Sequence, residues 1–170
     1  EQGLEDYLKI LEETTKRQAF YAHSPDYFRQ MWATLKDSNI MHILKASFEG
    51  QVLVVWILFV FNDVLHYPYG ASSSQHREVM ASNLMMWEAI RFGQKQQCQL
   101  FDMWGALGPN PDPKDPWYGF HRFKRSYGGK LVEYIGTYDL VNNYPIYKIY
   151  NLADNWRWKF LRFKKKFIKL

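Results

Sequence analysis

The sequence predicts a mixed α/β (α+β) fold in which a central, mostly antiparallel sheet is flanked by helices. Three apolar runs between residues 39 and 70 are joined by tight turns, which is typical of an antiparallel meander. Stretches with helical periodicity lie on both sides of these runs. The chain has 170 residues, 47% of them hydrophobic, which is enough to build one compact core.

Two helices are expected before the meander. In the first, apolar residues recur at helical spacing, at Leu4, Tyr7, Leu8 and Leu11. The second begins with Ser24 as N-cap and Pro25 at the first helical position. Its apolar residues, Phe28, Met31, Trp32 and Leu35, share one face.

The meander itself is predicted from its turns. Glu49-Gly50 and Asn62-Asp63 separate three short strands, and the middle run, residues 52–61, is expected to be buried. These ten apolar residues fall short of the roughly 20 that span a bilayer. With a single cysteine, Cys98, and no zinc-like spacing of Cys and His, we expect a cytoplasmic protein without a disulfide or a metal.

The second half of the chain alternates helices and strands. Residues 80–97 are apolar around much of the circumference and predict a helix packed into the sheet. Residues 100–104 predict a short strand, 107–116 a proline-rich loop, 117–127 a short helix ended by Gly128-Gly129, and 131–140 a final strand. We expect one domain over residues 1–154 and a basic amphipathic helix over 155–170.

The charge is concentrated at the C-terminus. The net charge is +5, yet residues 157–170 hold seven of the 22 Lys and Arg and no acid, so the rest of the chain is slightly acidic. A narrow arc of the expected helix carries Trp156, Phe160, Phe163, Phe167 and Leu170. Such a helix suits the anionic inner face of a membrane, tRNA phosphates, or docking on its own domain, and the sequence leaves these alternatives open.

Three stretches together carry a family resemblance: residues 14–28 (TTKRQAFYAHSPDYF), 66–74 (HYPYGASSS) and 101–140 (FDMWGALGPNPDPKDPWYGFHRFKRSYGGKLVEYIGTYDL). They resemble the second domain of the FemABX family, bacterial enzymes that build peptidoglycan cross-bridges. The resemblance implies a GNAT-like acyltransferase fold with a splayed sheet. It also implies transfer of an amino acid from aminoacyl-tRNA to an amine of a UDP- or lipid-linked peptidoglycan precursor, without a cofactor. The family's first domain has no counterpart here, so we expect either a missing partner domain or a sequence that is a piece of a longer protein.

The resemblance assigns the acyl-tRNA end of the site to residues 122–125. Phe123 would stack on the terminal adenosine of the tRNA, flanked by Arg122 and Arg125, and Lys124 would be the catalytic cation. From the residues alone, Lys124 lies near a helix C-terminus, where a cation is favoured and can hold a phosphate or a developing oxyanion. The alternative is a solvated lysine beside a core phenylalanine.

Precursor binding is assigned by the resemblance to Arg17 and Tyr21, expected four apart on the first helix, and to one of Tyr67 and Tyr69 at the end of the meander. An arginine fork suits a phosphate or a carboxylate. Surface packing for Arg17 and half-buried strand-end positions for the tyrosines are the alternatives. Asp102 is a candidate general base in the cleft, although a structural strand-end aspartate is the preferred interpretation.

Two other functions remain as alternatives. An acyl-CoA N-acyltransferase would need a glycine-rich pyrophosphate loop before the central helix, and the corresponding stretch, residues 72–83, contains no glycine. A non-catalytic domain that binds RNA or a membrane surface through its basic tail and its cleft is the runner-up.

Overall fold

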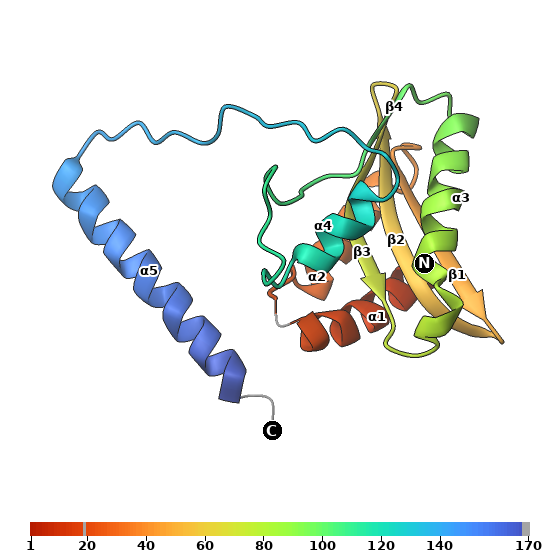
Figure 1. The fold of residues 1–170 in the computed structure, drawn as a ribbon, viewed down its shortest axis with the longest axis horizontal. Helices are drawn as coiled ribbons and strands as arrows, with labels where there is room; N and C mark the ends of the chain where they lie inside the picture. The colour runs from red at the N-terminus through yellow and green to blue at the C-terminus, as the bar shows by residue number, and fades with distance from the viewer. Residues whose placement is uncertain (19, 168–170) are drawn as a thin grey trace. The chain divides into compact units, whose positions relative to one another are not determined.

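The computed structural model describes residues 1–18 and 20–167, with side chains described as far as Leu161. The chain divides into two compact units, Glu1–Leu131 and Val132–Leu170 (Figure 1). The first unit holds the sheet, and the second holds a long helix, α5, over Tyr144–Phe167. Helix α5 runs through the expected boundary at residue 155, and the functional division of the chain stays a prediction.

Four strands form one sheet in the order β1-β2-β3-β4, which confirms the predicted fold class. They span Met41–Phe48, Gln51–Phe61, Val64–Ser72 and Leu100–Asp102. Strands β1, β2 and β3 are antiparallel, and β4 runs parallel to β3. Both predicted two-residue turns have positive φ at each position, 49° and 78° at Glu49-Gly50 and 50° and 58° at Asn62-Asp63. Such turns match the twist of the strands that they join.

Helices cover both faces of the sheet (Figure 1). Helices α1 (Gln2–Gln18) and α2 (Pro25–Leu35) pack against one face, and α3 (Ala81–Lys95) packs against the other. The Ser24 hydroxyl accepts a hydrogen bond from the Tyr27 N–H at 3.3 Å, which confirms the predicted N-cap. A short 3₁₀ turn, η1 (Arg77–Val79), precedes α3.

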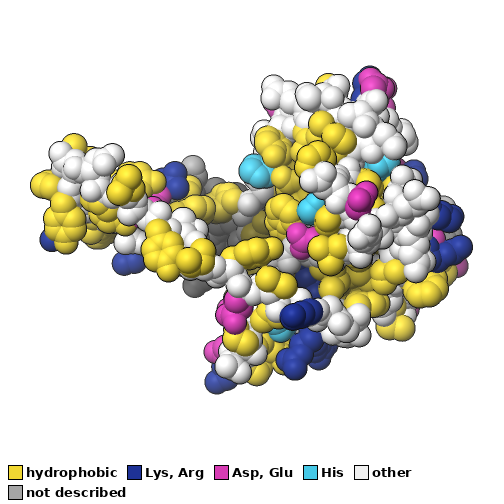
Figure 2. All heavy atoms as spheres, turned by 90° about the horizontal axis from the view of Figure 1, so that it is seen from above, with side chains coloured by type: hydrophobic (Ala, Val, Ile, Leu, Met, Phe, Trp, Pro, Cys, Tyr) yellow, Lys and Arg dark blue, Asp and Glu magenta, His cyan; other side chains and the backbone are white. Residues whose placement is uncertain are grey.

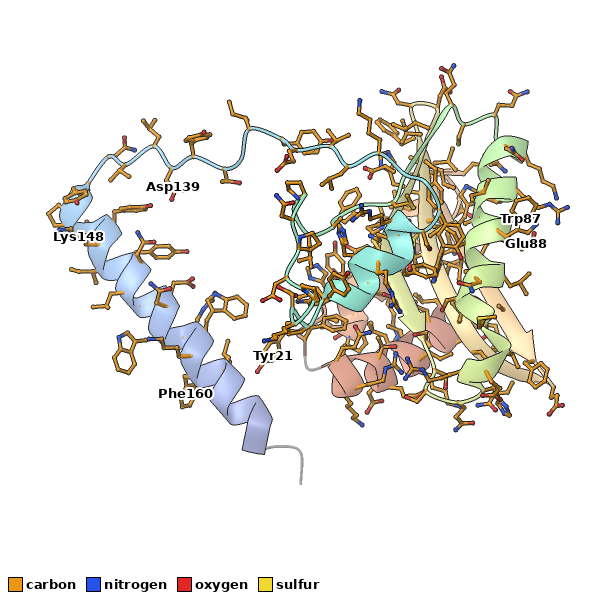
Figure 3. All side chains as sticks on the ribbon, viewed as in Figure 1. Tyr21, Trp87, Glu88, Asp139, Lys148 and Phe160 are labelled. Carbon is orange, nitrogen blue, oxygen red and sulfur yellow. The ribbon has the colours of Figure 1, made fainter. Side chains whose placement is uncertain are left out.

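Helix α3 is less enclosed than the sequence predicts. Its buried side, Met85, Met86 and Ala89, packs against the sheet, whereas Leu84 and Trp87 are 54% and 58% exposed. Trp87 and Glu88 project away from the sheet (Figure 3). The expectation of a helix packed into the sheet instead of lying on its surface was therefore wrong, because only one side of α3 meets the strands.

Strand β3 contains a β-bulge that reverses its faces. Ile57 pairs with Tyr69 and Phe59 pairs with His66, so Leu58 alone faces both Tyr67 and Pro68. Pro68 has no N–H to give to a ladder, which suits a bulge. As a result Tyr67 packs into the core on the α3 side, and Tyr69 packs into the core on the α1 and α2 side.

The second unit differs most from the prediction. Residues 131–140, predicted as a final strand, have no regular secondary structure, and Tyr134, Ile135 and Leu140 are 85%, 86% and 90% exposed. A strand needs a neighbouring edge to pair with, and the described part of this unit contains no other strand. Figure 2 shows hydrophobic side chains exposed along this unit.

Helix α5 confirms the predicted C-terminal helix, with Trp156 and Phe160 67% and 64% exposed. The side chains of Phe163, Phe167 and Leu170, predicted on the same arc, lie outside the described residues. Among the described helices, none is both long and apolar enough to cross a membrane.

Candidate functional site

A cleft of about 1340 Å³ in the first unit runs along the outer edge of β3. Every residue from Tyr67 to Ser73 lines it. Strand β4 pairs only with Val64, Leu65 and His66, so no strand of the described part of the chain lies beside the outer edge of β3 from Tyr67 onward. The cleft therefore occupies the place where the sheet splays open, as the sequence predicts.

The cleft has two walls of different construction. The strand wall consists of residues 67–72 of β3 and Ser73 directly after it, with Arg17 and Tyr21 beside them. The helix wall consists of Phe120, Arg122 and Phe123 of α4 (Tyr118–Arg125). Because the bulge turns Tyr67 and Tyr69 toward opposite faces, side chains from both faces of the sheet meet in one cleft.

The lining is cationic and aromatic. Arg17, Arg77 and Arg122 line the cleft with His23 and His76, and no Asp or Glu is found among its described lining residues. Ten aromatic residues also contribute, namely Tyr7, Phe20, Tyr21, Phe28, Trp56, Tyr67, Tyr69, Trp117, Phe120 and Phe123. This composition suits a ligand that carries negative charge and planar groups.

Arg17 is held against the end of β3. Its Nη1 donates to the Ser74 Oγ at 2.9 Å, and its Nη2 donates to the Ser72 carbonyl at 2.9 Å and the Ser72 Oγ at 3.1 Å. Partial burial and the nearby Arg77 charge lower the pKa of Arg17. Two guanidiniums beside one cleft favour an anion between them.

The sequence predicts Tyr21 on the first helix. This prediction was wrong, because α1 ends at Gln18. Tyr21 follows the helix in an irregular segment, 50% exposed, and still lines the cleft (Figure 3). The predicted pair of Arg17 and Tyr21 is thus brought to one cleft, although not by helical spacing.

The two tyrosines of β3 have different surroundings. Tyr67 is 8% exposed and stacks on Trp56 with ring centroids 3.8 Å apart, and burial raises the pKa of its phenol. The hydroxyl of Tyr69 lies 3.3 Å from that of Tyr27, and burial raises the pKa of Tyr69 to about 12. Both phenols stay protonated at neutral pH and can donate hydrogen bonds.

Tyr27 was not predicted as a site residue, and it is not among the described lining residues but contacts two of them. His23 stacks on its ring at 4.1 Å between centroids, and its hydroxyl meets Tyr69. The available signal was its position within the stretch 14–28, next to residues that were assigned to the site.

The helix wall is anchored by a few contacts. Phe123 packs edge-on against Trp56 at 6.5 Å and against Tyr127 at 5.3 Å. The Tyr127 hydroxyl donates to the Asn83 Oδ1 at 2.9 Å, which ties the end of α4 to the start of α3. The helix ends before Gly128, whose φ of 74° confirms the predicted glycine stop. Arg125 is exposed and is not among the described residues that line the cleft.

Lys124 lies behind the helix wall and is only 4% exposed, unlike a solvated lysine. Its Nζ donates to the backbone carbonyls of Met103 and Gly105, the latter at 2.9 Å, and lies 3.9 Å from the ring centroid of Phe120. Burial lowers the pKa of Lys124 to about 8, and the negative charge of Asp102 opposes this shift. Lys124 is absent from the described cleft lining, so its charge acts from behind the aromatic surface.

Asp102 ends β4 outside the described cleft lining. Its Oδ1 accepts the Trp104 N–H at 2.8 Å, and its Oδ2 lies 3.5 Å from the Nδ1 of His66. These contacts fit the preferred interpretation of a structural strand-end aspartate.

Comparison with known proteins places this geometry in a family. Residues 41–155 match the FemAB family. A lipid II:glycine glycyltransferase of Staphylococcus haemolyticus is 36% identical over 84 residues, which cover 49% of this chain and 20% of the relative. The enzyme of the same name from Staphylococcus epidermidis strain RP62A is 30% identical over 112 residues, or 66% of this chain and 27% of the relative. The matches therefore span about a quarter of these curated relatives.

Solved structures show the same fold. The crystal structure of FemX superimposes with a TM-score of 0.67 at 14% identity, covering 75% of this chain and 48% of that one. The aminoglycoside 6'-N-acetyltransferase AAC(6')-Ig of Acinetobacter haemolyticus superimposes with a TM-score of 0.59 at 16% identity, covering 84% and 95%. The predicted GNAT-like fold is confirmed. Because the family match spans well over half of the sequence, this chain belongs to the FemAB family.

Proposed function

We propose that this chain carries an aminoacyltransferase site, which moves an amino acid from aminoacyl-tRNA to an amine of a peptidoglycan precursor. The names of the relatives support lipid II as the acceptor, and the aminoacyl-tRNA donor is taken from the family resemblance. The match covers 48% of FemX, which supports this chain as one half of a two-domain enzyme. Glycine is the amino acid favoured by the relatives' names.

The observation that carries the proposal is the composition of the cleft. Three arginines and ten aromatic residues line it without a described carboxylate. Both proposed substrates are polyanions with planar groups, because tRNA carries phosphates and bases and the precursor carries a diphosphate. A carboxylate in this cleft would repel them.

The reaction needs no protein nucleophile. The acceptor amine attacks the ester carbonyl of the aminoacyl-tRNA, a C–N bond forms, and the amine loses a proton. The tetrahedral oxyanion then collapses, the C–O bond to the ribose breaks, and the ribose oxygen takes up a proton. Holding the two substrates together in the cleft supplies much of the rate. The Lys124 ammonium, fixed behind Phe120, adds a positive potential that favours the oxyanion.

Each wall takes one substrate in this proposal. Phe123 offers the terminal adenosine a stacking surface, and Arg122 offers its phosphate a cation. On the strand wall, Arg17 binds a precursor phosphate, and the protonated phenols of Tyr67 and Tyr69 orient the precursor. Exposed Arg125 extends the cationic surface toward the tRNA.

Single-turnover transfer of radiolabelled amino acids from a charged bacterial tRNA pool to lipid II tests the proposal. Phe123→Leu keeps an apolar side chain but removes the ring, so we expect transfer to fall by about tenfold or more. Phe61→Leu is the matched control, because Phe61 is 58% exposed and lies outside the cleft lining.

Equal activity of wild type and Phe123→Leu would contradict the stacking role. No transfer by the folded chain, even with the first half of a FemAB relative added, would contradict the aminoacyltransferase assignment. Transfer only with that half present would establish the two-domain arrangement. Retention on a CoA matrix without transfer from tRNA would favour an acyl-CoA enzyme instead.

Helix α5 contributes a contact surface in the same proposal. It exposes Ile146, Ile149 and Trp156 on a basic helix, which suits the headgroup region of an anionic membrane that carries lipid-linked precursor. Removal of residues 145–170 should lower binding to anionic vesicles and leave transfer to a soluble precursor intact. Loss of every activity in a folded truncated chain would favour a non-catalytic binding domain.

A further inference from the structure

The free edge of β3 presents its backbone to the cleft at Gly70. The Ser73 N–H donates to the Leu53 carbonyl at 2.7 Å, so this pair is hydrogen-bonded across the ladder. Pairs alternate along an antiparallel ladder, and the backbone groups of Ser72 and Gly70 therefore point away from β2. For Ser72 the contacts confirm this direction, because its N–H and carbonyl meet the Thr14 Oγ1 at 3.1 and 3.0 Å.

At Gly70 the same outward groups have no such cap. Among the described residues, no side chain or loop backbone is found hydrogen-bonded to the Gly70 N–H or carbonyl. Gly70 is half-buried and lines the cleft, on the side of β3 that has no described strand beside it. An unpaired N–H and carbonyl on a strand edge form a template for another extended chain.

The neighbours of Gly70 limit this template to one residue. Pro68, on one side, has no N–H to donate. Ser72, on the other side, is occupied by Thr14. A long β-ladder is therefore blocked at both ends, and a chain that binds here can pair with Gly70 alone.

Only glycine fits this position. A Cβ at residue 70 would overlap the hydroxyl of Tyr67, whose ring leans over the strand. The Tyr67 phenol thus lies where a side chain at residue 70 would stand, and it remains a donor because burial raises its pKa. Glycine inside a strand often marks a place where another backbone comes close.

We propose that an extended peptide segment of the acceptor binds along this edge, with one of its residues paired to Gly70 by two backbone hydrogen bonds. The Gly70 N–H donates to a peptide carbonyl, and the Gly70 carbonyl accepts a peptide N–H. This inference rests on the proposed function for the identity of the peptide. Pairing at a single residue fixes the register of the peptide, and so fixes the distance from that residue to its reacting amine.

The probe is a synthetic peptidoglycan stem pentapeptide, with a series in which one amide nitrogen at a time is methylated. N-methylation removes one donor without any change to the protein. We expect one position to weaken binding about tenfold and the others less than about twofold, because one hydrogen bond is lost. A flat series would overturn the proposal.

A second measurement locates the bound peptide. Labelling tyrosine carbonyls with ¹³C and glycine nitrogens with ¹⁵N selects only the Tyr-Gly pairs, namely Gly70, Gly119 and Gly128. Gly119 lines the cleft and reports its occupancy, whereas Gly128 is not among the described lining residues and is the control. The Gly70 signal is assigned by its disappearance in Tyr69→Phe.

We expect the unmodified peptide to slow exchange of the Gly70 amide hydrogen by about tenfold or more, with Gly128 unchanged. Binding that leaves Gly70 exchange unaltered would overturn the inference, as would failure of the peptide to bind at roughly millimolar concentration. Neither readout depends on transfer. Transfer without slowed exchange at Gly70 would support the proposed function and contradict the peptide subsite. Slowed exchange at Gly70 without transfer would support the subsite and contradict the proposed function.

Discussion

The two walls of the cleft are built in different ways. The strand wall is part of the sheet: β3 is paired to β2 along its length, Thr14 caps its edge, and Arg17 is bound to Ser72 and Ser74. The helix wall is a helix of eight residues, α4, with polar anchors at Lys124 and Tyr127.

This difference separates binding from alignment. Many independent hydrogen bonds hold the strand wall, so the loss of one side chain should weaken a contact to the ligand and leave the wall in place. Few contacts hold the helix wall, so the loss of one should move the surface on which the second substrate stacks. Transfer depends on the alignment of both substrates, and it should be most sensitive to the helix wall.

The largest effect is expected for Lys124→Met, which removes the buried charge and leaves two carbonyls without their donor. Turnover should fall by about 10²–10³, the range found for the loss of one group that stabilises an oxyanion, with the KM for precursor changed only a few-fold. Single-turnover and steady-state transfer assays separate the effect on turnover from the effect on the KM for precursor. Lys95→Met, on the exposed last turn of α3, is the control. Equal losses in turnover and in precursor binding would contradict the distinction between the walls.

The pH dependence of transfer should come next. The pKa of Lys124 is lowered by burial from 10.5 to about 8, so the ammonium form is lost as the pH rises above about 8. Transfer should then fall about tenfold per pH unit, as for a single ionisation. Transfer rates of wild type and Lys124→Arg measured against pH test this. The arginine keeps its charge, so its rate should not decrease above about pH 8.

Stability should change in the opposite direction over the same range. Between about 8 and 10.5 the unfolded chain binds a proton at Lys124 that the folded chain has released, so the free energy of unfolding rises with pH. The free energy of unfolding of wild type minus that of Lys124→Met should grow by at most about 1.4 kcal/mol per pH unit. Denaturant unfolding across this range measures it, and a difference that shrinks would contradict the shift.

Arg17→Met should have a smaller effect on transfer, confined to binding. It removes the hydrogen bonds to Ser72 and Ser74 and one cation of the strand wall, so the KM for precursor should rise about tenfold, with turnover at saturation nearly unchanged. Arg91→Met is the control, because Arg91 pairs with Glu88 on α3. Reduced turnover at an unchanged KM would place Arg17 in alignment and not in binding.

The smallest effect is expected for Tyr127→Phe. Loss of its hydrogen bond to Asn83 should lower the free energy of unfolding by about 0.5–1.5 kcal/mol and transfer by a few-fold. Tyr134→Phe, at a side chain that is 85% exposed, should leave both unchanged. A loss as large as that of Lys124→Met would show that Tyr127 is the main anchor.

Local patterns in the sequence predicted most of the fold. Ser24 and Pro25 marked a helix start, and Asn62-Asp63 marked a hairpin turn, because each acts through its immediate neighbours. Residues 131–140 have the composition of a strand and were predicted as one. That prediction failed because pairing depends on a second edge, which composition does not reveal.

The candidate site was predictable as a set of residues and not as an arrangement. The family resemblance named Arg17, Tyr67, Tyr69 and Phe123, and all four line one cleft. The pairing of Lys124 with the carbonyls of Met103 and Gly105 joins residues far apart in the sequence, and no local pattern indicates it. The capping of Ser72 by Thr14 was hidden for the same reason.

The bulge in β3 also has an evolutionary consequence. Leu58 faces both Tyr67 and Pro68, so deletion of Pro68 would leave Leu58 opposite Tyr67 alone, with Tyr69 to Ser72 still paired to the same residues of β2 and on the same faces. Tyr69 would keep its place in the aromatic group that it forms with Tyr27 and Phe28. Descendants of this chain can therefore lose the extra residue at the bulge without moving the side chains of the strand wall to the other face of the sheet.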